Sequence, residues 1–222
     1  MKFYQVDQYT KEWSELRKGM PTASFAHLFI TPDGKPKNPD TQERKRYLYK
    51  LVAERILQIP MPSSFDGNEH TERGHALEER ATQSFFAQSG YKVAPGGFCR
   101  TDDGRYGCSP DGLMRNKREA LEVKCPAVWT HMQYMCEGPG DKYKAQVQMQ
   151  IMIGEFDCVH FWSYHPDFAP VHVVTLPDER YIARLHEQLD LFYQEIQSKE
   201  GYVRRHGNVG ELIIREVKGE TS

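Results

Sequence analysis

The sequence has 222 residues, of which 39% are hydrophobic and 12% aromatic, a composition typical of a folded globular protein. The 29 Lys and Arg residues are balanced by 31 Asp and Glu residues, which excludes a general basic coat for nucleic acid. No apolar run is long enough to cross a bilayer, and the N-terminus lacks the apolar core of a secretory signal. The five cysteines are odd in number and form no CxxC pair, so we predict reduced thiols in a cytoplasmic protein.

Helical patterns dominate the first ninety residues. Short helices are predicted over Tyr9–Gly19 and Thr22–Phe29, followed by a loop rich in Gly, Pro, Asn and Asp over Thr31–Asp40. A longer amphipathic helix is predicted over Thr41–Gln58, with a basic side that is a candidate wall of a DNA channel. Its apolar face is formed by Leu48, Leu51, Val52 and Ile56. Another helix is predicted over His70–Ser89.

After residue 90 the pattern changes to short runs separated by Gly, Asp and Pro, which predicts a β-meander over Tyr91–Cys125. Two helices follow near Val128–Cys136 and Asp141–Gly154. Strands are then predicted over Cys158–His165 and Val171–Leu176.

The last long pattern, over 178–197, has apolar residues at alternating spacings of three and four. A helix docked on the core is favoured over a coiled coil, because so few heptads are present. The apolar residues are Ile182, Leu185, Leu189, Phe192 and Ile196. The tail after Gly201 is expected to fray. Together the elements predict a single α/β domain over residues 1–222.

The segment Cys108–Pro126 contains the candidate chemistry. The turn Ser109–Gly112 can hold Asp111 rigidly, because proline fixes one dihedral angle and glycine permits the reversal. Glu122 and Lys124 are two residues apart and therefore share one face of the following strand. If the two segments pair as a hairpin, the carboxylates converge and suit Mg²⁺ or Mn²⁺. The alternative is the solvated face of an ordinary antiparallel sheet.

Other histidine and cysteine patterns are weaker. His160 and His165 fall on opposite faces of their strand and lack the spacing of metal ligands, so we predict structural roles for both. Cys108 and Cys125 flank the acidic hairpin, and buried small thiols are the favoured interpretation.

The hairpin motifs resemble the catalytic core of the PD-(D/E)xK nucleases, and more narrowly the bacteriophage lambda exonuclease and its viral recombinase relatives, the YqaJ family. Three further motifs are similar to that family's L-R-x-G-x-x-T-A-S, G-x-x-x-E and A-Q-V-Q and occur in the family's order. In chain order the motifs are Leu16–Ser24, Gly74–Glu78, Ser109–Gly112, Glu122–Pro126 and Ala145–Gln148.

The resemblance implies a restriction-endonuclease-like core, a central mixed β-sheet flanked by helices. It also implies Mg²⁺-dependent, processive 5′-to-3′ exonuclease activity on linear duplex DNA, with Mn²⁺ as a substitute metal. A 3′ single strand would be left for recombination. The family forms ring-shaped homotrimers around DNA, and a single-strand annealing recombinase is the expected partner. A phage or prophage origin in a bacterial host follows from the same resemblance.

Metal ligands are implied residue by residue. Asp111 and Glu122 would bind the metal with the backbone carbonyl of Val123. Glu78 would reach the same site directly or through water. Lys124 would act on the attacking water.

The remaining motif residues are assigned to the nucleophile and to the DNA end. Gln148 would orient the nucleophile, with Gln146 as the alternative, because residues two apart on a helix face different ways. Arg17, Ser24 and Ser109 would form a pocket for the 5′-terminal phosphate.

One departure concerns the apolar wedge that splits the duplex end in lambda-type enzymes. The corresponding segment, Asn68–Arg73, is polar, so strand separation would need a residue from Ile59–Phe65 or another route. Two alternative functions stay open: an endonuclease on the same core, and a non-catalytic protein that binds DNA ends.

Overall fold

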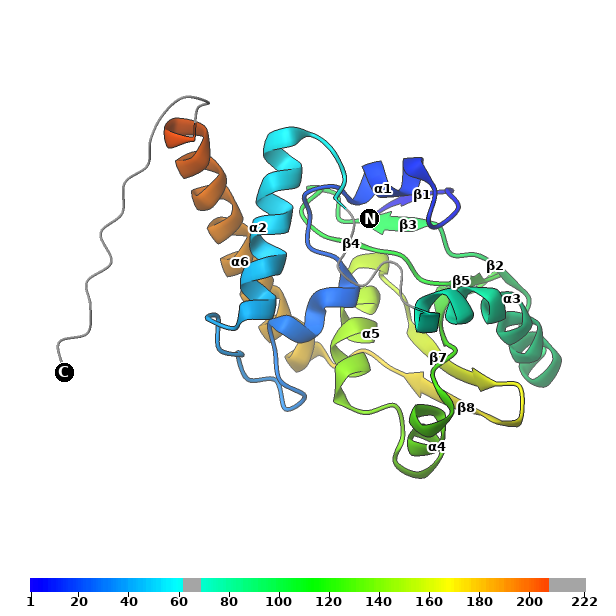
Figure 1. Cartoon of the computed structure of the whole chain (residues 1–222). Coiled ribbons are helices and arrows are strands. Elements are labelled where there is room, and N and C mark those ends of the chain that lie inside the picture. The colour runs from blue at the N-terminus through cyan, green and yellow to red at the C-terminus, as the bar shows by residue number, and fades with distance from the viewer. Residues whose placement is uncertain (62–68, 208–222) are drawn as a thin grey trace.

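The computed structural model describes residues 1–61 and 69–207, without the side chains of residues 69–76 and 141–142 (Figure 1). Seven helical segments are described: α1 (Lys11–Arg17), the 3₁₀ helix η1 (Ala23–Leu28), α2 (Gln42–Leu57), α3 (Glu69–Ser89), α4 (Val128–Glu137), α5 (Asp141–Gly154) and α6 (Glu179–His206). The strands are β1 (Lys2–Tyr4), β2 (Val93–Pro95), β3 (Phe98–Arg100), β4 (Gly107–Cys108), β5 (Gly112–Met114), β6 (Glu119–Lys124), β7 (Cys158–His165) and β8 (Phe168–Thr175).

The larger sheet is mixed and has the order β2-β5-β6-β7-β8. Its strands pair antiparallel except for β6 and β7, which run parallel with Glu122 opposite Phe161. A parallel pair requires a long crossover, and here the chain between the two strands forms α4 and α5. The crossover helix α5 is thereby placed beside β6, the strand that carries the acidic motif.

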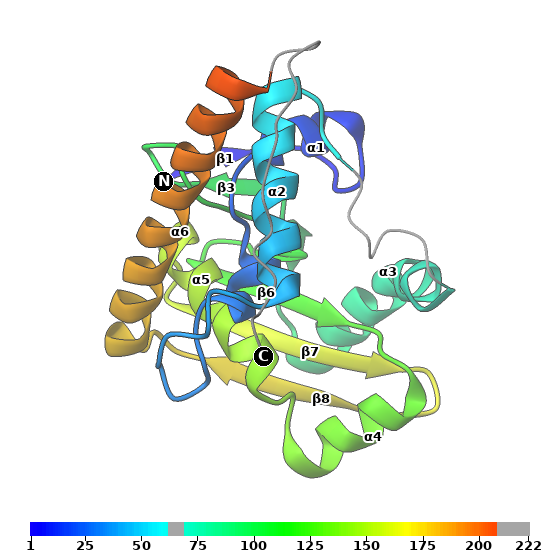
Figure 2. The same ribbon diagram turned by 60° about the vertical axis from the view of Figure 1, so that its left-hand side comes forward.

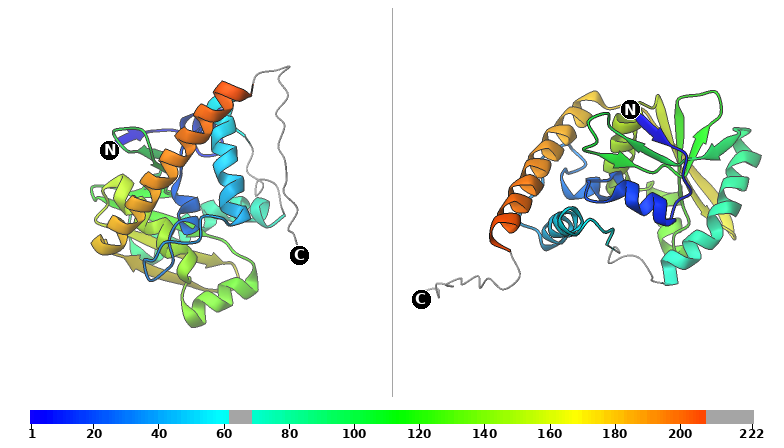
Figure 3. Two further views of the ribbon diagram at one scale, coloured as in Figure 1. Left: turned by 90° about the vertical axis from the view of Figure 1, so that its left-hand side faces the viewer. Right: turned by 90° about the horizontal axis from the view of Figure 1, so that it is seen from above.

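Different helices cover the two faces of this sheet (Figure 3). On one face, α3 packs through Ala81 and Phe85 against Leu121 and Val123 of β6. The opposite face packs on apolar residues of η1, α2, α5 and α6, which form the larger of the hydrophobic clusters. The alternation of side chains along β6 therefore points Glu122 away from α3 and toward α5.

The segment 91–125 does not form one continuous meander, and that prediction was wrong. Only β2, β5 and β6 join the large sheet, whereas β3 and β4 pair with β1 in a second sheet of order β1-β3-β4. The chain passes from the large sheet to the second sheet after Pro95. Gly97, in this crossing segment, has a positive φ of 60°. A Cβ on Gly97 would lie 2.4 Å from the Tyr4 carbonyl oxygen, so only glycine lets the chain pass so close to β1.

The helices follow the predicted apolar patterns. Leu48, Leu51 and Val52 of α2 are buried, and Leu185 and Leu189 of α6 are fully buried against α2 and α5. The docked-helix interpretation of α6 is confirmed, but the helix continues to residue 206, nine residues beyond the predicted end. Over residues 1–61 and 69–207, no helix is both long enough and apolar enough to cross a membrane.

Two of the five basic residues of α2 are paired with carboxylates of α6, which lies alongside it (Figure 2). Arg44 binds Glu195 at 2.8 Å, and Arg55 binds Glu200 at 2.7 Å. Arg44 is only 8% exposed. These two cations hold the helices together and do not present charge to DNA.

Candidate active site

The predicted hairpin forms and brings its two acidic segments together. Gly112 of β5 pairs with Leu121 of β6, and the Asp111 amide donates to the Leu121 carbonyl at 2.9 Å. The Val123 amide in turn donates to Asp111 Oδ2 at 2.6 Å. One oxygen of Asp111 is therefore fixed by the backbone of the strand that carries Glu122, and Oδ1 is left for a ligand.

The backbone at Gly96 packs closely against the turn that carries Asp111. A Cβ on Gly96 would lie 1.8 Å from the Pro110 carbonyl oxygen, a distance that no side chain can tolerate. The same carbonyl accepts a hydrogen bond from Gln8 Nε2 at 2.9 Å. The turn that presents Asp111 is thus held from two sides.

Glu122 is buried at 2% exposure and is surrounded by donors. Gln146 Nε2 donates to Oε1 at 2.6 Å, and Gln150 Nε2 donates to Oε2 at 2.5 Å. The Lys124 ammonium also pairs with Oε1. Gln146 and Gln150 are four residues apart on α5 and therefore reach the same side of the helix. Together these contacts fix the carboxylate in one orientation.

The structure does not bring Gln148 into this group. Gln148 Nε2 donates to the Leu176 carbonyl at 2.8 Å, and its Oε1 accepts from the Asp178 amide at 3.0 Å. Two residues along a helix turn the side chain by roughly 200°, so Gln148 faces the start of α6 and Gln146 faces Glu122. Of the two glutamines considered, the alternative, Gln146, is the one that contacts the acidic hairpin.

Burial and like charge act together on the hairpin. Burial, followed by the negative charge of Glu122, raises the pKa of Asp111 well above its usual range. Burial alone would lower the pKa of Lys124, but the charges of Glu122 and Asp111 outweigh it and raise that pKa above the usual range. Lys124 is therefore a protonated donor. Its single positive charge does not balance the negative charges of Asp111 and Glu122 when both are ionised.

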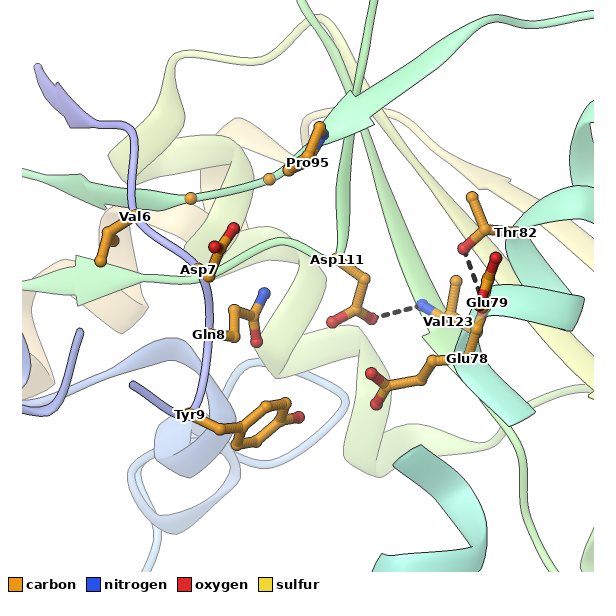
Figure 4. A pocket seen from close by; sticks show the side chains of 12 residues that line it. Val6, Asp7, Gln8, Tyr9, Glu78, Glu79, Thr82, Pro95, Asp111 and Val123 are labelled. Atoms are coloured by element: carbon orange, nitrogen blue, oxygen red, sulfur yellow. Dashed lines mark hydrogen bonds between the residues drawn. The ribbon is translucent and has the colours of Figure 1, made fainter. Parts of the chain in front are cut away.

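A cavity of about 270 Å³ opens beside Asp111 (Figure 4). Its walls include Asp111 and Val123 from the hairpin and Glu78 from α3. The Glu78 carboxylate points toward Asp111 across the opening. Glu122 is not part of the cavity wall and lies buried beneath it. Glu78, the residue of α3 that was predicted to reach the metal, therefore lies beside the hairpin.

The N-terminal segment Val6–Tyr9 forms the opposite wall of the cavity (Figure 4). Tyr9 has a positive φ of 66°, an uncommon conformation for a bulky residue. Its hydroxyl points toward Glu78. Partial burial raises the pKa of Tyr9, and the charges of Glu78 and Asp111 raise it further. The phenol thus stays protonated as a donor facing two carboxylates.

The predicted phosphate pocket is organised around Trp13. The Arg17 guanidinium lies 3.8 Å from the centre of the Trp13 ring, and Trp13 Nε1 donates to Ser109 Oγ at 2.8 Å. Arg17 Nη2 also approaches Thr22 Oγ1 at 3.5 Å. These contacts place Arg17 over the face and Ser109 at the edge of one indole, next to the turn that carries Asp111.

Local backbone contacts explain why these distant segments meet. The Gly107 amide of β4 donates to the Pro21 carbonyl at 3.1 Å, and Thr22 forms a bridge with Gly107. Ser24 follows at the exposed start of η1, where its carbonyl accepts from His27 Nδ1 at 3.2 Å. Ser24 lies outside the chain of contacts that joins Arg17 to Ser109. Of the predicted wedge segments, the structure describes residues 59–61 in full and 69–73 without side chains, and the rest lies outside the described residues.

Three residues at the site were missed by sequence reasoning. Trp13 precedes Arg17 by four residues, and Gln150 follows Gln146 by four, so the helical spacing was an available signal in both cases. Tyr9 carries no sequence pattern that marks it.

The residues present fit a hard divalent cation. Asp111 Oδ1, the Val123 carbonyl and Glu122 Oε2, which accepts only one hydrogen bond, supply oxygen ligands of the kind that Mg²⁺ prefers. Burial, followed by the charge of Glu122, raises the pKa of Asp111, and a bound cation would favour its ionised form.

A mixed sheet flanked by helices, with two carboxylates and a lysine on one hairpin, defines an α/β protein with a restriction-endonuclease-like core. The family model of the YqaJ-like viral recombinase domain matches residues 12–157, and the chain belongs to this family. The resemblance drawn from the motifs, and the fold that it implied, are confirmed.

Solved structures agree with this assignment. The chain is similar to an alkaline exonuclease from Laribacter hongkongensis, with a TM-score of 0.78 and 25% identity over 89% of this chain and 98% of that one. The same values hold for that enzyme in complex with dAMP. A phage-related exonuclease from Haemophilus somnus 129PT shares the fold, with a TM-score of 0.61, 16% identity, and coverage of 84% of this chain and 98% of that one. A comparison with curated protein sequences gives no match.

Proposed function

We propose that the protein is a Mg²⁺-dependent exonuclease that degrades linear duplex DNA from the 5′ end and leaves a 3′ single strand. The observation that carries this proposal is the hairpin on which Asp111, Glu122 and Lys124 converge, with Asp111 locked to the Val123 amide. Family membership and the similarity to alkaline exonucleases support a nuclease function.

Each residue of the hairpin has a separate task in this proposal. Asp111, Glu122 and the Val123 carbonyl would hold the metal, with Glu78 reaching it directly or through water. When bound, Mg²⁺ would lower the pKa of a water molecule and neutralise charge on the scissile phosphate. Lys124, kept protonated by its neighbours, would donate a hydrogen bond to the attacking water or to a phosphate oxygen. Gln146 would act through Glu122, which it keeps in place.

End recognition would fall to the pocket around Trp13. Arg17 and Ser109 flank the indole beside Asp111, so a terminal phosphate held there would leave the next phosphodiester near the metal ligands. Arg with hydroxyl groups suits a phosphate dianion. Ser24 would close this pocket once DNA is bound. The Laribacter hongkongensis enzyme has been solved in complex with dAMP, a nucleotide that carries such a phosphate.

Processivity requires the enzyme to stay on one DNA molecule between cuts. We propose that residues 1–222 act as one domain and assemble into a homotrimeric ring around DNA, within the cytoplasm of a bacterial host. A single-strand annealing recombinase would receive the 3′ strand. Sedimentation of the purified protein at three times the chain mass is the expected result for the ring.

The proposed activity is tested with a time course on linear duplex DNA carrying a 5′-phosphate or a 5′-hydroxyl, beside a closed circular plasmid. Wild type with Mg²⁺ is expected to degrade the phosphorylated 5′ strand and to spare circles. Chelation and Asp111→Ala should each abolish cleavage. Asp167→Ala, in the exposed turn between β7 and β8, is the matched control and should keep full activity.

Two other outcomes would replace the proposal. Cutting of the closed circle would identify an endonuclease on the same core. Binding to DNA ends without cleavage in Mg²⁺ or Mn²⁺ would identify a non-catalytic end-binding protein.

A further inference from the structure

A second group of potential metal ligands lies at the opposite end of β6 from Lys124. Glu119 begins β6 and Cys158 begins β7, and the parallel register sets these two residues side by side. His160 follows two residues later on the same face of β7. One ligand atom from each of the three residues falls within 4.8 Å of the other two. The sequence concealed this group, because Glu119 comes from a different strand than Cys158 and His160 and is remote from them in the chain.

The separations within the group are close to those around a tetrahedral ion. Cys158 Sγ lies 3.6 Å from His160 Nε2, which lies 3.0 Å from Glu119 Oε2. Zinc bound by sulfur and nitrogen at its usual bond lengths would set these two atoms about 3.5 Å apart, and nitrogen and oxygen about 3.3 Å apart. The three atoms therefore need little movement to accept an ion.

Neighbouring side chains orient two of the three ligands, His160 and Glu119. His160 Nδ1 lies 2.9 Å from Nε2 of His172 on β8. A hydrogen bond donated by Nδ1 leaves Nε2 without a proton and facing the other two ligands, which is the usual arrangement for a zinc-bound histidine. Lys117 Nζ lies 3.3 Å from Glu119 Oε1, so the other carboxylate oxygen is turned toward His160.

The group is enclosed on three sides and open on one. Cys158 and His160 are 7% and 3% exposed, whereas the Glu119 side chain is 18% exposed. The rings of Tyr91 and Phe85 pack on His160 at centroid distances of 5.2 and 5.8 Å. An ion would enter past Glu119 and keep a water as its fourth ligand.

The position and chemistry separate this group from the acidic hairpin. Five residues of extended strand place Glu119 roughly 15 Å from Lys124, and the Glu119 side chain lies on the α3 face, opposite Glu122. Thiolate and imidazole are ligands for zinc, whereas the hairpin offers only oxygen to a hard cation.

We propose that Glu119, Cys158 and His160 form a zinc site that ties the starts of β6 and β7 together. His172 is a positioning residue that acts through His160. The role is structural, because the ion would cross-link the two central strands of the sheet far from the proposed cleavage site.

The test measures zinc and cobalt binding by the full chain in an Asp111→Asn background, which weakens ion binding at the hairpin. After chelation and reloading, elemental analysis should find about one zinc per chain. Cys158→Ser and His160→Gln should each lose it, while Cys136→Ser, at an exposed cysteine on α4, should retain it. Cobalt should produce a thiolate-to-metal absorption band that Cys158→Ser abolishes.

Either of two results would overturn the proposal: no zinc on the reloaded Asp111→Asn protein, or equal zinc on Asp111→Asn and both ligand variants. If Cys158→Ser fails to fold, the comparison rests on cobalt spectra of Asp111→Asn with and without Cys136→Ser. A thiolate band that survives Cys136→Ser and is lost in His160→Gln supports the site, and the absence of any thiolate band refutes it. The thermal midpoint should rise on zinc addition in Asp111→Asn and stay fixed in His160→Gln.

Discussion

Asp111 is held where burial and a neighbouring carboxylate oppose its ionisation. Its folded-state pKa is raised, so over a range above the ordinary value of 3.8 the folded chain keeps a proton that the unfolded chain releases. Folding stability contributed by this group therefore falls as the pH rises through that range. The carboxylate of Asp111 is placed to bind a ligand, and its unfavourable ionisation lowers the folding stability of the metal-free protein.

Asp111→Asn should consequently stabilise the metal-free protein at pH 8. Asparagine can still accept the Val123 hydrogen bond without carrying a buried charge. We expect a gain of about 1 kcal/mol, which corresponds to roughly 2–4 °C in thermal midpoint for a chain of this size. Thermal unfolding in chelator measures the gain, which should shrink toward pH 4.

Added Mg²⁺ provides the complementary measurement. It should raise the midpoint of wild type and leave Asp111→Asn unchanged, because one ligand has lost its charge. If the thermal midpoint of Asp111→Asn lies below that of wild type in chelator, ionisation of Asp111 does not destabilise the folded protein.

The two glutamines of α5 should separate activity from stability. Gln146→Ala removes a donor from Glu122 and is expected to lower cleavage by about 10- to 100-fold with little effect on folding. Gln148→Ala removes two hydrogen bonds at the start of α6 and should cost about 1–2 kcal/mol of stability, with near-normal cleavage. Cleavage rates and denaturant midpoints of both variants decide the assignment, and the reverse pattern would restore Gln148 to the site.

At the residue scale, the motifs predicted candidate site residues but not always the direction in which their side chains point. Glu78, Asp111 and Val123 do line one cavity. The choice between Gln146 and Gln148 depended on the rotation of α5, which is set by packing against the sheet and has no local signal. The Trp13 contact was absent from the predictions because it joins α1 to a turn almost a hundred residues away.

At the element scale, β6 organises both the hairpin and the proposed zinc site. Its side chains alternate between α5 and α3, so a one-residue slip would turn Glu122 into the apolar cluster beneath α3. The antiparallel pairing with β5 and the parallel pairing with β7 together prevent this slip.

The docking of α6 can be tested on its own. Leu189 is fully buried, so Leu189→Ala should cost about 2–5 kcal/mol through lost burial and the cavity left behind. Leu191 lies on the same helix with 53% exposure, and Leu191→Ala should change stability by less than about 0.5 kcal/mol. Urea denaturation of both variants measures the difference, and equal costs would contradict the docked arrangement.

Periodicity predicted the long elements well and the short ones less well. The apolar spacing of α2 and α6 specifies the buried face, and the structure has both helices. The predicted helix after Pro21 is a 3₁₀ segment, because its six residues fill the space between α5 and β4. The division of the meander between two sheets depends on a crossing near Gly97, which only the tertiary structure reveals.

At the scale of the whole molecule, acidic and basic residues are nearly equal in number, and the formal net charge is −2. Arg44 and Arg55 are bound by carboxylates between α2 and α6, and Arg105, in the loop before β4, is bound by Asp190 of α6. In the proposed function, we therefore expect binding to DNA to depend on a few well-placed cations rather than on a broad basic surface.

The salt dependence of DNA affinity should identify these cations individually. In an Asp111→Asn background, Arg17→Ala is expected to flatten the plot of log affinity against log salt concentration by about 0.9 on 5′-phosphorylated ends. Arg118→Ala is the control, because Arg118 is exposed and pairs with Asp157 at the far end of β6. An unchanged slope for Arg17→Ala would remove Arg17 from the phosphate pocket.

The contact between Trp13 and Arg17 gives the molecule a built-in optical probe. The chain has three tryptophans: Trp129 is 66% exposed on α4, and Trp162 is buried on the face covered by α3. With both replaced by phenylalanine, fluorescence would come from Trp13 alone, whose indole contacts a guanidinium over its face and Ser109 at its edge. A phosphate that draws the guanidinium away would change the emission intensity, so arrival of a DNA end could be followed in real time without a label.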